Sequence, residues 1–132
     1  MISPPMANRL SPQLHRLEGT LCNSCNGMMM SSRSVCGVCS SSDVVHTTFS
    51  CLGELIAFTL VTYPAEAFAN LPSQPQGLVQ LQSGPRVLAS ICDVDFEDLQ
   101  IGMRGELVTR RLFEPSGAAM INYGYKFRPF RD

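Results

Sequence analysis

The stretch CNSCNGMMMSSRSVCGVC, which runs from Cys22 to Cys39, decides the expected fold of this chain. It contains two C-x-x-C pairs, Cys22 with Cys25 and Cys36 with Cys39, separated by ten residues. Two such pairs facing each other supply the four soft ligands of a tetrahedral metal site. Four thiolates close the coordination sphere, whereas a catalytic zinc usually keeps one position open. We therefore predict a structural, rubredoxin-like zinc ribbon, with iron as the alternative metal because tetrahedral sulfur suits both.

Other uses of these cysteines fit the sequence less well. A thioredoxin-like redox site needs one C-x-x-C in a β–α–β context, and two pairs occur here without that context. Disulfide frameworks belong to exported proteins, and the first residues, MISPPMANRLSPQ, have prolines where a signal peptide needs an apolar core. No stretch approaches the roughly 18 apolar residues that span a bilayer. We expect a cytoplasmic chain that does not enter a membrane.

Three consecutive methionines, Met28, Met29 and Met30, lie between the two cysteine pairs. Methionine side chains fill irregular gaps in cores and also line adaptable binding surfaces. We favour packing of the ribbon on the rest of the protein over a partner-binding surface. Because a ribbon this small lacks a core of its own, metal binding is expected to contribute on the order of 10 kcal/mol to its folding.

The remaining chain divides into three parts. Residues 1–15 are predicted to form a loose N-terminal arm, in which Pro12 limits any helix to a turn or two. Residues 16–43 form the ribbon, and residues 44–132 form a β-rich domain. Its predicted strands cover 44–51, 54–63, two segments within 77–94 around a turn at 82–85, 104–114 and 118–130. A long loop at 64–76 and a short helix at 95–103 complete a mainly β fold, which suits a five-stranded OB-fold barrel.

Few residues suggest catalysis. His15 and His46 lie outside any recognised catalytic motif and are expected to be surface or hydrogen-bonded histidines. Cys51 and Cys92 are predicted to be buried, small apolar residues within strands. Acidic residues cluster at Asp93, Asp95, Glu97 and Asp98, where we expect them to mark the start of the short helix. We do not expect this chain to perform chemistry alone.

Charge is sparse and uneven. Charged residues make up 16% of the chain, the net charge is −1 and the isoelectric point is about 6.1. The segment from Arg104 to Arg131 is nonetheless basic, and aromatic residues at 123, 125, 127 and 130 alternate there with cations. This alternation predicts aromatic side chains on one strand face and cations on the other. The aromatics could close the barrel core, which we favour, stack on single-stranded nucleic acid, or accompany cations that hold the phosphates of CoA; the acidic isoelectric point argues against nucleic acid.

Several motifs together resemble one known family. They are HRLEGTLC before the ribbon, GELIAFTLVTYPAEAF and GPRVLASICDVDFEDLQIGM in the barrel, and the ending YGYKFRP. This combination resembles the zinc-ribbon/OB-fold acyl-CoA-associated family, domain of unknown function 35, over about residues 16–129. IGMRGELVTRRL and NYGYKFRP look most like archaeal members, which are similar to the small subunit bridging acetoacetyl-CoA thiolase and hydroxymethylglutaryl-CoA synthase at the start of the mevalonate pathway of isoprenoid biosynthesis.

The resemblance implies a non-catalytic scaffold that docks thiolase-fold enzymes and helps an acyl-CoA intermediate pass between them, with CoA as a candidate ligand at the shared interface. It places Cys22, Cys25, Cys36 and Cys39 on the family's metal ligands. The alternative partners are an acyl-CoA lyase, a hydratase or a polyketide acyltransferase, and the alternative class is a single-strand nucleic-acid-binding OB module. Family members often carry glycine after the second cysteine of each pair, where this chain has Asn26 and Ser40.

Overall fold

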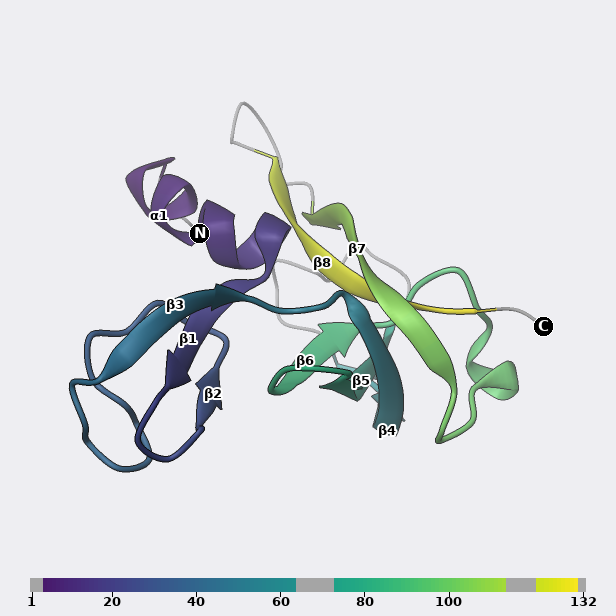
Figure 1. The fold of residues 1–132 in the computed structure, drawn as a ribbon. Helices are drawn as coiled ribbons and strands as arrows, with labels where there is room; N and C mark the ends of the chain where they lie inside the picture. The colour runs from purple at the N-terminus through teal and green to yellow at the C-terminus, as the bar shows by residue number, and fades with distance from the viewer. Residues whose placement is uncertain (1–3, 64–72, 114–120, 131–132) are drawn as a thin grey trace.

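Two antiparallel sheets lie side by side in the computed structural model, which describes residues 4–63, 73–113 and 121–130 (Figure 1). The smaller sheet has the strand order β2-β1-β3, and the larger has the order β6-β5-β4-β7-β8. The small sheet consists of β1 (Glu18–Cys22), β2 (Met28–Met29) and β3 (Val44–Thr48). The large sheet consists of β4 (Leu52–Leu60), β5 (Pro75–Leu81), β6 (Arg86–Ser90), β7 (Arg104–Phe113) and β8 (Asn122–Pro129).

The large sheet curls into a nearly closed barrel. Its first and last strands in spatial order, β6 and β8, approach each other through a parallel bridge between Ile91 and Phe127. The N–H of Cys92 donates to the carbonyl oxygen of Phe127 at 2.9 Å at the same place. A register shift between Leu55 and Ala57 in β4 adds the local bend that closure requires. The predicted mainly β fold, with a four-cysteine ribbon and a five-stranded barrel, is thus confirmed.

One expected barrel strand belongs to the other sheet. The segment 44–51 was predicted to open the barrel, but β3 pairs along its whole length with β1 of the ribbon, from Glu18 opposite Thr48 to Cys22 opposite Val44. The bond from the N–H of Phe49 to the carbonyl oxygen of Leu17 continues this pairing by one step. β-branched composition marks a strand but does not specify its partner. The chain therefore leaves the small sheet only after Phe49.

The N-terminal segment is more regular than expected. Residues Pro4–Arg16 form one helix, α1, which continues through Pro12 and so corrects the prediction of a loose arm broken at that residue. Pro12 removes only the bond to the carbonyl of Asn8, which is exposed and can be hydrated. The helix is supported from one side, because it contacts β1 and β8 and its Leu10 and Leu14 are half-buried.

The predicted helix at 95–103 shrinks to one 3-10 turn, Phe96–Asp98. Asp95 makes no side-chain capping bond at its start. The backbone that follows forms hydrogen bonds with the barrel strand β4 instead. The N–H of Gly102 donates to the carbonyl of Leu55 at 2.8 Å, and the N–H of Leu55 donates to the carbonyl of Met103 at 2.9 Å. Pairing with β4 therefore replaces further helical turns.

The structure describes some of the turns and loops that connect the barrel strands. The predicted turn at 82–85 joins β5 to β6, closed by the N–H of Leu81 on the carbonyl of Pro85 at 3.4 Å. β5 begins at Pro75, two residues earlier than predicted. Most of the predicted loop at 64–76, and the junction at 115–117, lie outside the described residues. In the part of the chain that the structure describes, no helix is long and apolar enough to cross a membrane.

One core serves both sheets. Leu55, Val79, Leu81 and Phe127 fill the barrel and are almost completely buried. The residues that flank the small sheet, Leu17 and Phe49, belong to the same buried cluster. The ribbon is therefore packed on the barrel through continuous apolar contact.

Candidate metal centre

The structure brings the four predicted cysteine ligands together. The sulfur atoms of Cys22, Cys25, Cys36 and Cys39 all lie within 4.8 Å of one another. The Sγ atoms of Cys22 and Cys39 are 3.5 Å apart, and those of Cys25 and Cys36 are 3.6 Å apart. Four sulfurs bonded to one zinc at about 2.3 Å would be separated by roughly 3.8 Å, whereas a disulfide bond is about 2.05 Å long. The separations therefore fit four ligands around one ion, and all four cysteines are free of disulfides.

The two cysteine pairs have the same local geometry. In the first, the N–H of Cys22 donates to the carbonyl of Gly27 at 2.9 Å, and in the second the N–H of Cys36 donates to the carbonyl of Ser41 at 2.9 Å. Each hydrogen bond joins residues five positions apart and closes a tight turn. The two sulfurs of each turn point toward the other pair of cysteines. The first cysteine of each pair is buried and the second is exposed. The site is therefore built from two matching turns, one after β1 and one before β3.

The residue after each pair adopts a left-handed backbone conformation. Asn26 has a φ of 56° and Ser40 has a φ of 59°. Only glycine enters this region freely, and asparagine tolerates it better than most other residues. This backbone conformation favours glycine at both positions, and it leaves Ser40 the more strained of the two.

Replacing Ser40 by glycine is expected to stabilise the protein by about 0.5–1 kcal/mol, because relief of the left-handed strain outweighs the added chain entropy of glycine. The change is measured as the free energy of unfolding of the metal-loaded protein. Ser42→Gly is the matched control, since Ser42 is exposed without a positive φ, and it should be slightly destabilising. Equal losses from both variants would contradict the assignment of strain to Ser40.

Backbone hydrogen bonds and neighbouring thiols give the cysteines of the cluster different pKa values. The N–H groups of Cys39 and Val38 lower the pKa of Cys36 to about 6. The Gly27 N–H acts in the same direction at Cys25, but bonding to Cys39, burial and Cys36 outweigh it and raise the pKa of Cys25 to about 12. The backbone N–H groups therefore favour the thiolate at Cys36, whereas the neighbouring thiols and burial favour the thiol at Cys25. A soft divalent cation would displace the remaining protons and allow all four sulfurs to be ligands.

The three methionines have separate surroundings. Met30 packs against the barrel core, in line with the favoured prediction. Met29 stays within the ribbon, where its Sδ accepts the N–H of Gly37 at 3.3 Å. Met28 is 44% exposed. Only Met28 therefore remains for contact with another molecule.

The other two cysteines are less buried than predicted. Cys51 is exposed and Cys92 is only partly buried. Cys51 precedes β4, and its carbonyl accepts the N–H of Leu107 at 2.8 Å, so its backbone and not its side chain joins the barrel. Burial, and then the charge of Asp93, raise the pKa of the Cys92 thiol. Neither residue belongs to the metal cluster.

Both histidines are exposed, as expected. His15 lies in the last turn of α1. His46 lies in β3, and its Nδ1 is 3.2 Å from the hydroxyl of Ser32. Neither therefore has the buried, oriented setting of a catalytic base.

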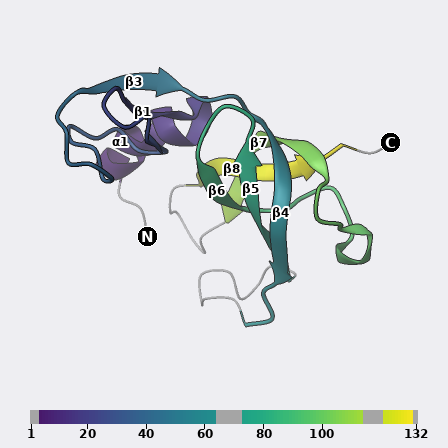
Figure 2. The ribbon, with the colours of Figure 1, turned by 60° about the horizontal axis from the view of Figure 1, so that its bottom comes forward.

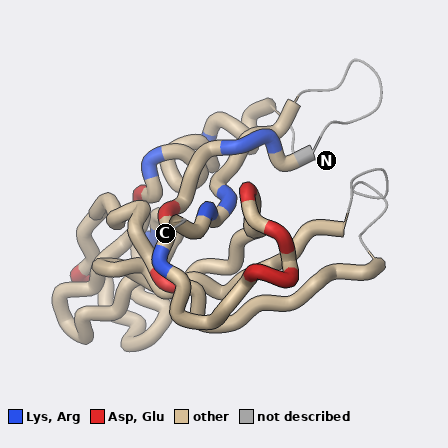
Figure 3. The backbone as a smooth tube through the Cα atoms, turned by 90° about the vertical axis from the view of Figure 1, so that its right-hand side faces the viewer, with Lys and Arg blue, Asp and Glu red and all other residues tan. Residues whose placement is uncertain are grey.

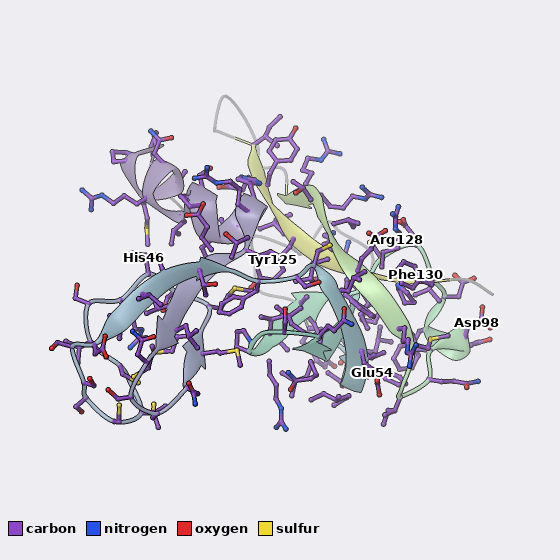
Figure 4. All side chains as sticks on the ribbon, viewed as in Figure 1. His46, Glu54, Asp98, Tyr125, Arg128 and Phe130 are labelled. Atoms are coloured by element: carbon purple, nitrogen blue, oxygen red, sulfur yellow. The ribbon has the colours of Figure 1, made fainter. Side chains whose placement is uncertain are left out.

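The predicted basic face of the last strands is partly neutralised. Arg110 pairs with Asp93 at 3.2 Å, and Arg128, which is labelled in Figure 4, pairs with Glu106. Lys126 is buried and donates to the side-chain oxygen of Gln74 at 3.1 Å. Figure 3 shows acidic and basic stretches close together on this side of the molecule.

Aromatic residues of β8 do not form one exposed stacking face. Phe127 is fully buried in the core, Tyr125 is partly buried, and Tyr123 is 50% exposed. The register is unbroken at Lys126, which therefore points to the face opposite Tyr125 and Phe127 as predicted, but its side chain is buried and not solvated. The preferred interpretation, that these aromatics close the core, holds for Phe127.

A hollow of about 510 Å³ opens beside Phe130, the residue that follows β8. Leu52, Leu81 and Phe130 give it apolar walls, and Glu54 and Arg104 stand opposite each other on β4 and β7. Arg104 makes no ion pair with a carboxylate among the described residues. The sequence placed Arg104 and Phe130 in a basic, aromatic segment but did not predict that Glu54 and Leu81 would lie beside them, because this convergence depends on the register of three strands.

Comparison with known proteins agrees with this geometry. The family described as the C-terminal OB-fold domain of ChsH2 matches residues 48–110. A DUF35 domain-containing scaffold protein of Pyrococcus furiosus is 40% identical over 116 residues, covering 87% of this chain and 84% of the relative. The protein of the same name from Methanothermobacter thermautotrophicus is 29% identical over 119 residues, covering 89% of this chain and 90% of the relative. A solved structure named Ltp2-ChsH2(DUF35) aldolase aligns with a TM-score of 0.64 and 22% identity, covering 86% of this chain and 84% of that one.

A four-cysteine ribbon packed on an OB-fold barrel defines a class of small two-module β proteins. Within that class, the chain belongs to the DUF35 family, whose archaeal members it matches over most of its length.

Proposed function

We propose that this chain is a non-catalytic scaffold subunit that holds acyl-CoA enzymes together. The observation that carries the proposal is the 40% identity, over most of both chains, to a protein named as a scaffold. The partners we propose are the thiolase-fold enzymes acetoacetyl-CoA thiolase and hydroxymethylglutaryl-CoA synthase, acting in the cytoplasm at the start of the mevalonate pathway. The motifs IGMRGELVTRRL and NYGYKFRP, which look most like archaeal members, support this choice.

The proposed ion is zinc, held by Cys22, Cys25, Cys36 and Cys39. Four thiolates with sulfur separations near those of a tetrahedral site support this assignment. Zinc at a closed site of this kind supplies structural cross-linking and no chemistry on a substrate. It would fix the two turns relative to β1 and β3, and so determine the shape of the ribbon surface.

CoA could contact the subunit at the hollow beside Phe130. The guanidinium of Arg104, which has no carboxylate partner among the described residues, lies next to apolar walls and suits a ligand with phosphates and an aromatic base. The hollow is open on one side, so an enzyme would have to complete it. We therefore place CoA, if shared, between this chain and its partner.

The scaffold proposal predicts a stable complex with the thiolase and the synthase encoded in the same genome. Purified, metal-loaded protein should co-elute with both enzymes in size-exclusion chromatography, because a scaffold must bind them simultaneously. Static light scattering gives the mass of the complex. Failure of both enzymes to co-elute at micromolar concentrations would overturn these partners.

An aldolase partner is the second candidate. It is favoured by the structural neighbour, whose name describes a DUF35 chain together with an aldolase. A complex with an aldolase or lyase from the same genome, formed when thiolase and synthase do not bind, would favour this candidate.

A further inference from the structure

The two sheets have edge strands that differ in how well they are protected from pairing with another chain. β2 has only two residues, β6 carries Arg86 directly after Pro85, and β8 carries Lys126 and Arg128. Short length, charge and proline are the usual protections of an edge. β3, the other edge of the small sheet, has five residues, VVHTT, without an Arg, Lys, Asp, Glu or Pro. It runs along the outside of the molecule in Figure 2.

The register of the small sheet shows which backbone groups of β3 are unused. The N–H of Phe49 donates to the carbonyl of Leu17, which fixes the phase of the antiparallel pairing. Bonded and non-bonded pairs alternate along such a ladder, so Val45 and Thr47 exchange bonds with β1. The N–H of Val44, the first outward position, donates to the carbonyl of Ser42 at 3.0 Å, and within the described ranges no hydrogen bond joins the backbone groups of the other two outward positions to another residue. These two positions, whose N–H and C=O point outward, are His46 and Thr48.

An apolar row crosses the same sheet and reaches this edge. Leu21 of β1 lies opposite Met28 of β2 on one side and opposite Val45 of β3 on the other. Directly opposed residues share a sheet face, so these three side chains form one row. Met28 is 44% exposed and Val45 is 42% exposed. The sequence carries no charged residue from position 19 to position 32.

We propose that β3 is a docking strand, onto which an extended, uncharged segment of the partner enzyme adds as a fourth strand of the small sheet. The inference rests on the proposed scaffold function and names the part of the chain that binds. The free N–H and C=O groups of His46 and Thr48 would pair with the added backbone. An apolar side chain of that segment would extend the row of Met28, Leu21 and Val45.

The test compares His46→Pro with His46→Gln. Proline removes the outward N–H and places its ring against an incoming strand, yet it removes no bond to β1, because the His46 N–H does not point there. Glutamine keeps the N–H and is the matched control. Binding of each variant to the purified thiolase and synthase is measured by biolayer interferometry. We expect His46→Pro to weaken binding at least tenfold and His46→Gln to change it less than about twofold.

A second measurement does not depend on variants. Amide hydrogen exchange of the wild-type protein, resolved by NMR, should show the amides of His46 and Thr48 strongly protected in the complex and rapidly exchanging in the free chain. Metal content and thermal unfolding of His46→Pro establish whether the variant is folded. If it is not, the exchange data decide alone.

The outcomes separate this inference from the proposed function. Wild-type binding with unprotected amides at His46 and Thr48 would overturn the docking strand and leave the scaffold role intact. Wild-type binding to neither enzyme would overturn the scaffold role with these partners, and the docking strand with it. Protection of the same amides in the free chain, together with a dimeric mass, would show that a second copy of this chain occupies the edge and would also overturn the inference.

Discussion

Replacing Cys36 by serine is expected to abolish metal binding and to unfold the ribbon. Cys36 is buried at 3% exposure, and its sulfur lies 3.6 Å from that of Cys25 in the cluster of four. A hydroxyl is a poor ligand for zinc compared with a thiolate, and three sulfurs leave the site open. Structural zinc contributes on the order of 10 kcal/mol in small modules, which is comparable to the whole stability of an ordinary domain. We expect bound metal to fall from about one ion per chain to almost none.

The consequences are measurable in separate parts of the chain. Metal content by mass spectrometry reports on the site, and hydrogen exchange of residues 18–22 and 44–48 reports on the small sheet. Removing the ion with a chelator should give the same exchange pattern as the variant. Cys51→Ser is the matched control, because Cys51 is an exposed cysteine outside the cluster, and it should keep the metal and the protection of both strands. Retention of metal by Cys36→Ser would contradict the ligand assignment.

The cysteine cluster was predictable because its information is local. Each C-x-x-C pair makes its own turn, and two such pairs a short distance apart in the chain are the pattern of a shared metal site. The left-handed backbone at Asn26 and Ser40 could not be deduced from these two residues, since neither is glycine.

Strand partners were less predictable than strands. The residues of β3 have the β-branched composition of a strand, and that composition is equally suited to the ribbon and the barrel. Hydrogen bonds to β1, whose residues lie more than 20 positions earlier, place β3 in the ribbon sheet. The same reason applies to Gly102 and Met103, whose pairing with Leu55 ended the expected helix. Long-range backbone pairing overrides local preference in both cases.

The side chains of β8 show the limit of periodicity. Alternation predicts one buried and one solvated face, which holds for a sheet covered on one side. In β8, Lys126 is buried at 7% exposure although it lies on the face opposite fully buried Phe127, and its amine donates to the side chain of Gln74. The basic surface expected from the sequence is reduced by this burial and by the ion pairs of Arg110 and Arg128.

Replacing Phe127 by alanine is expected to lower the free energy of unfolding by about 3–5 kcal/mol, the usual cost of emptying a buried phenylalanine site. Phe127 is fully buried, belongs to the barrel core, and lies where β8 bridges to Ile91 to close the barrel. The cavity cannot easily be filled by collapse, because the backbone of Phe127 is also held by the N–H of Cys92 at 2.9 Å. The loss is measured by urea unfolding of the metal-loaded protein.

Tyr123→Ala is the matched control for this closure argument, since it removes an aromatic ring from the same strand at a position that is 50% exposed. It should cost no more than about 1 kcal/mol, because little apolar area returns to water. A difference between the two variants of several kcal/mol would show that the β8 aromatics act in the barrel core at Phe127 and not as a surface row. Similar small losses from both variants would contradict the position of Phe127 as the residue that closes the barrel.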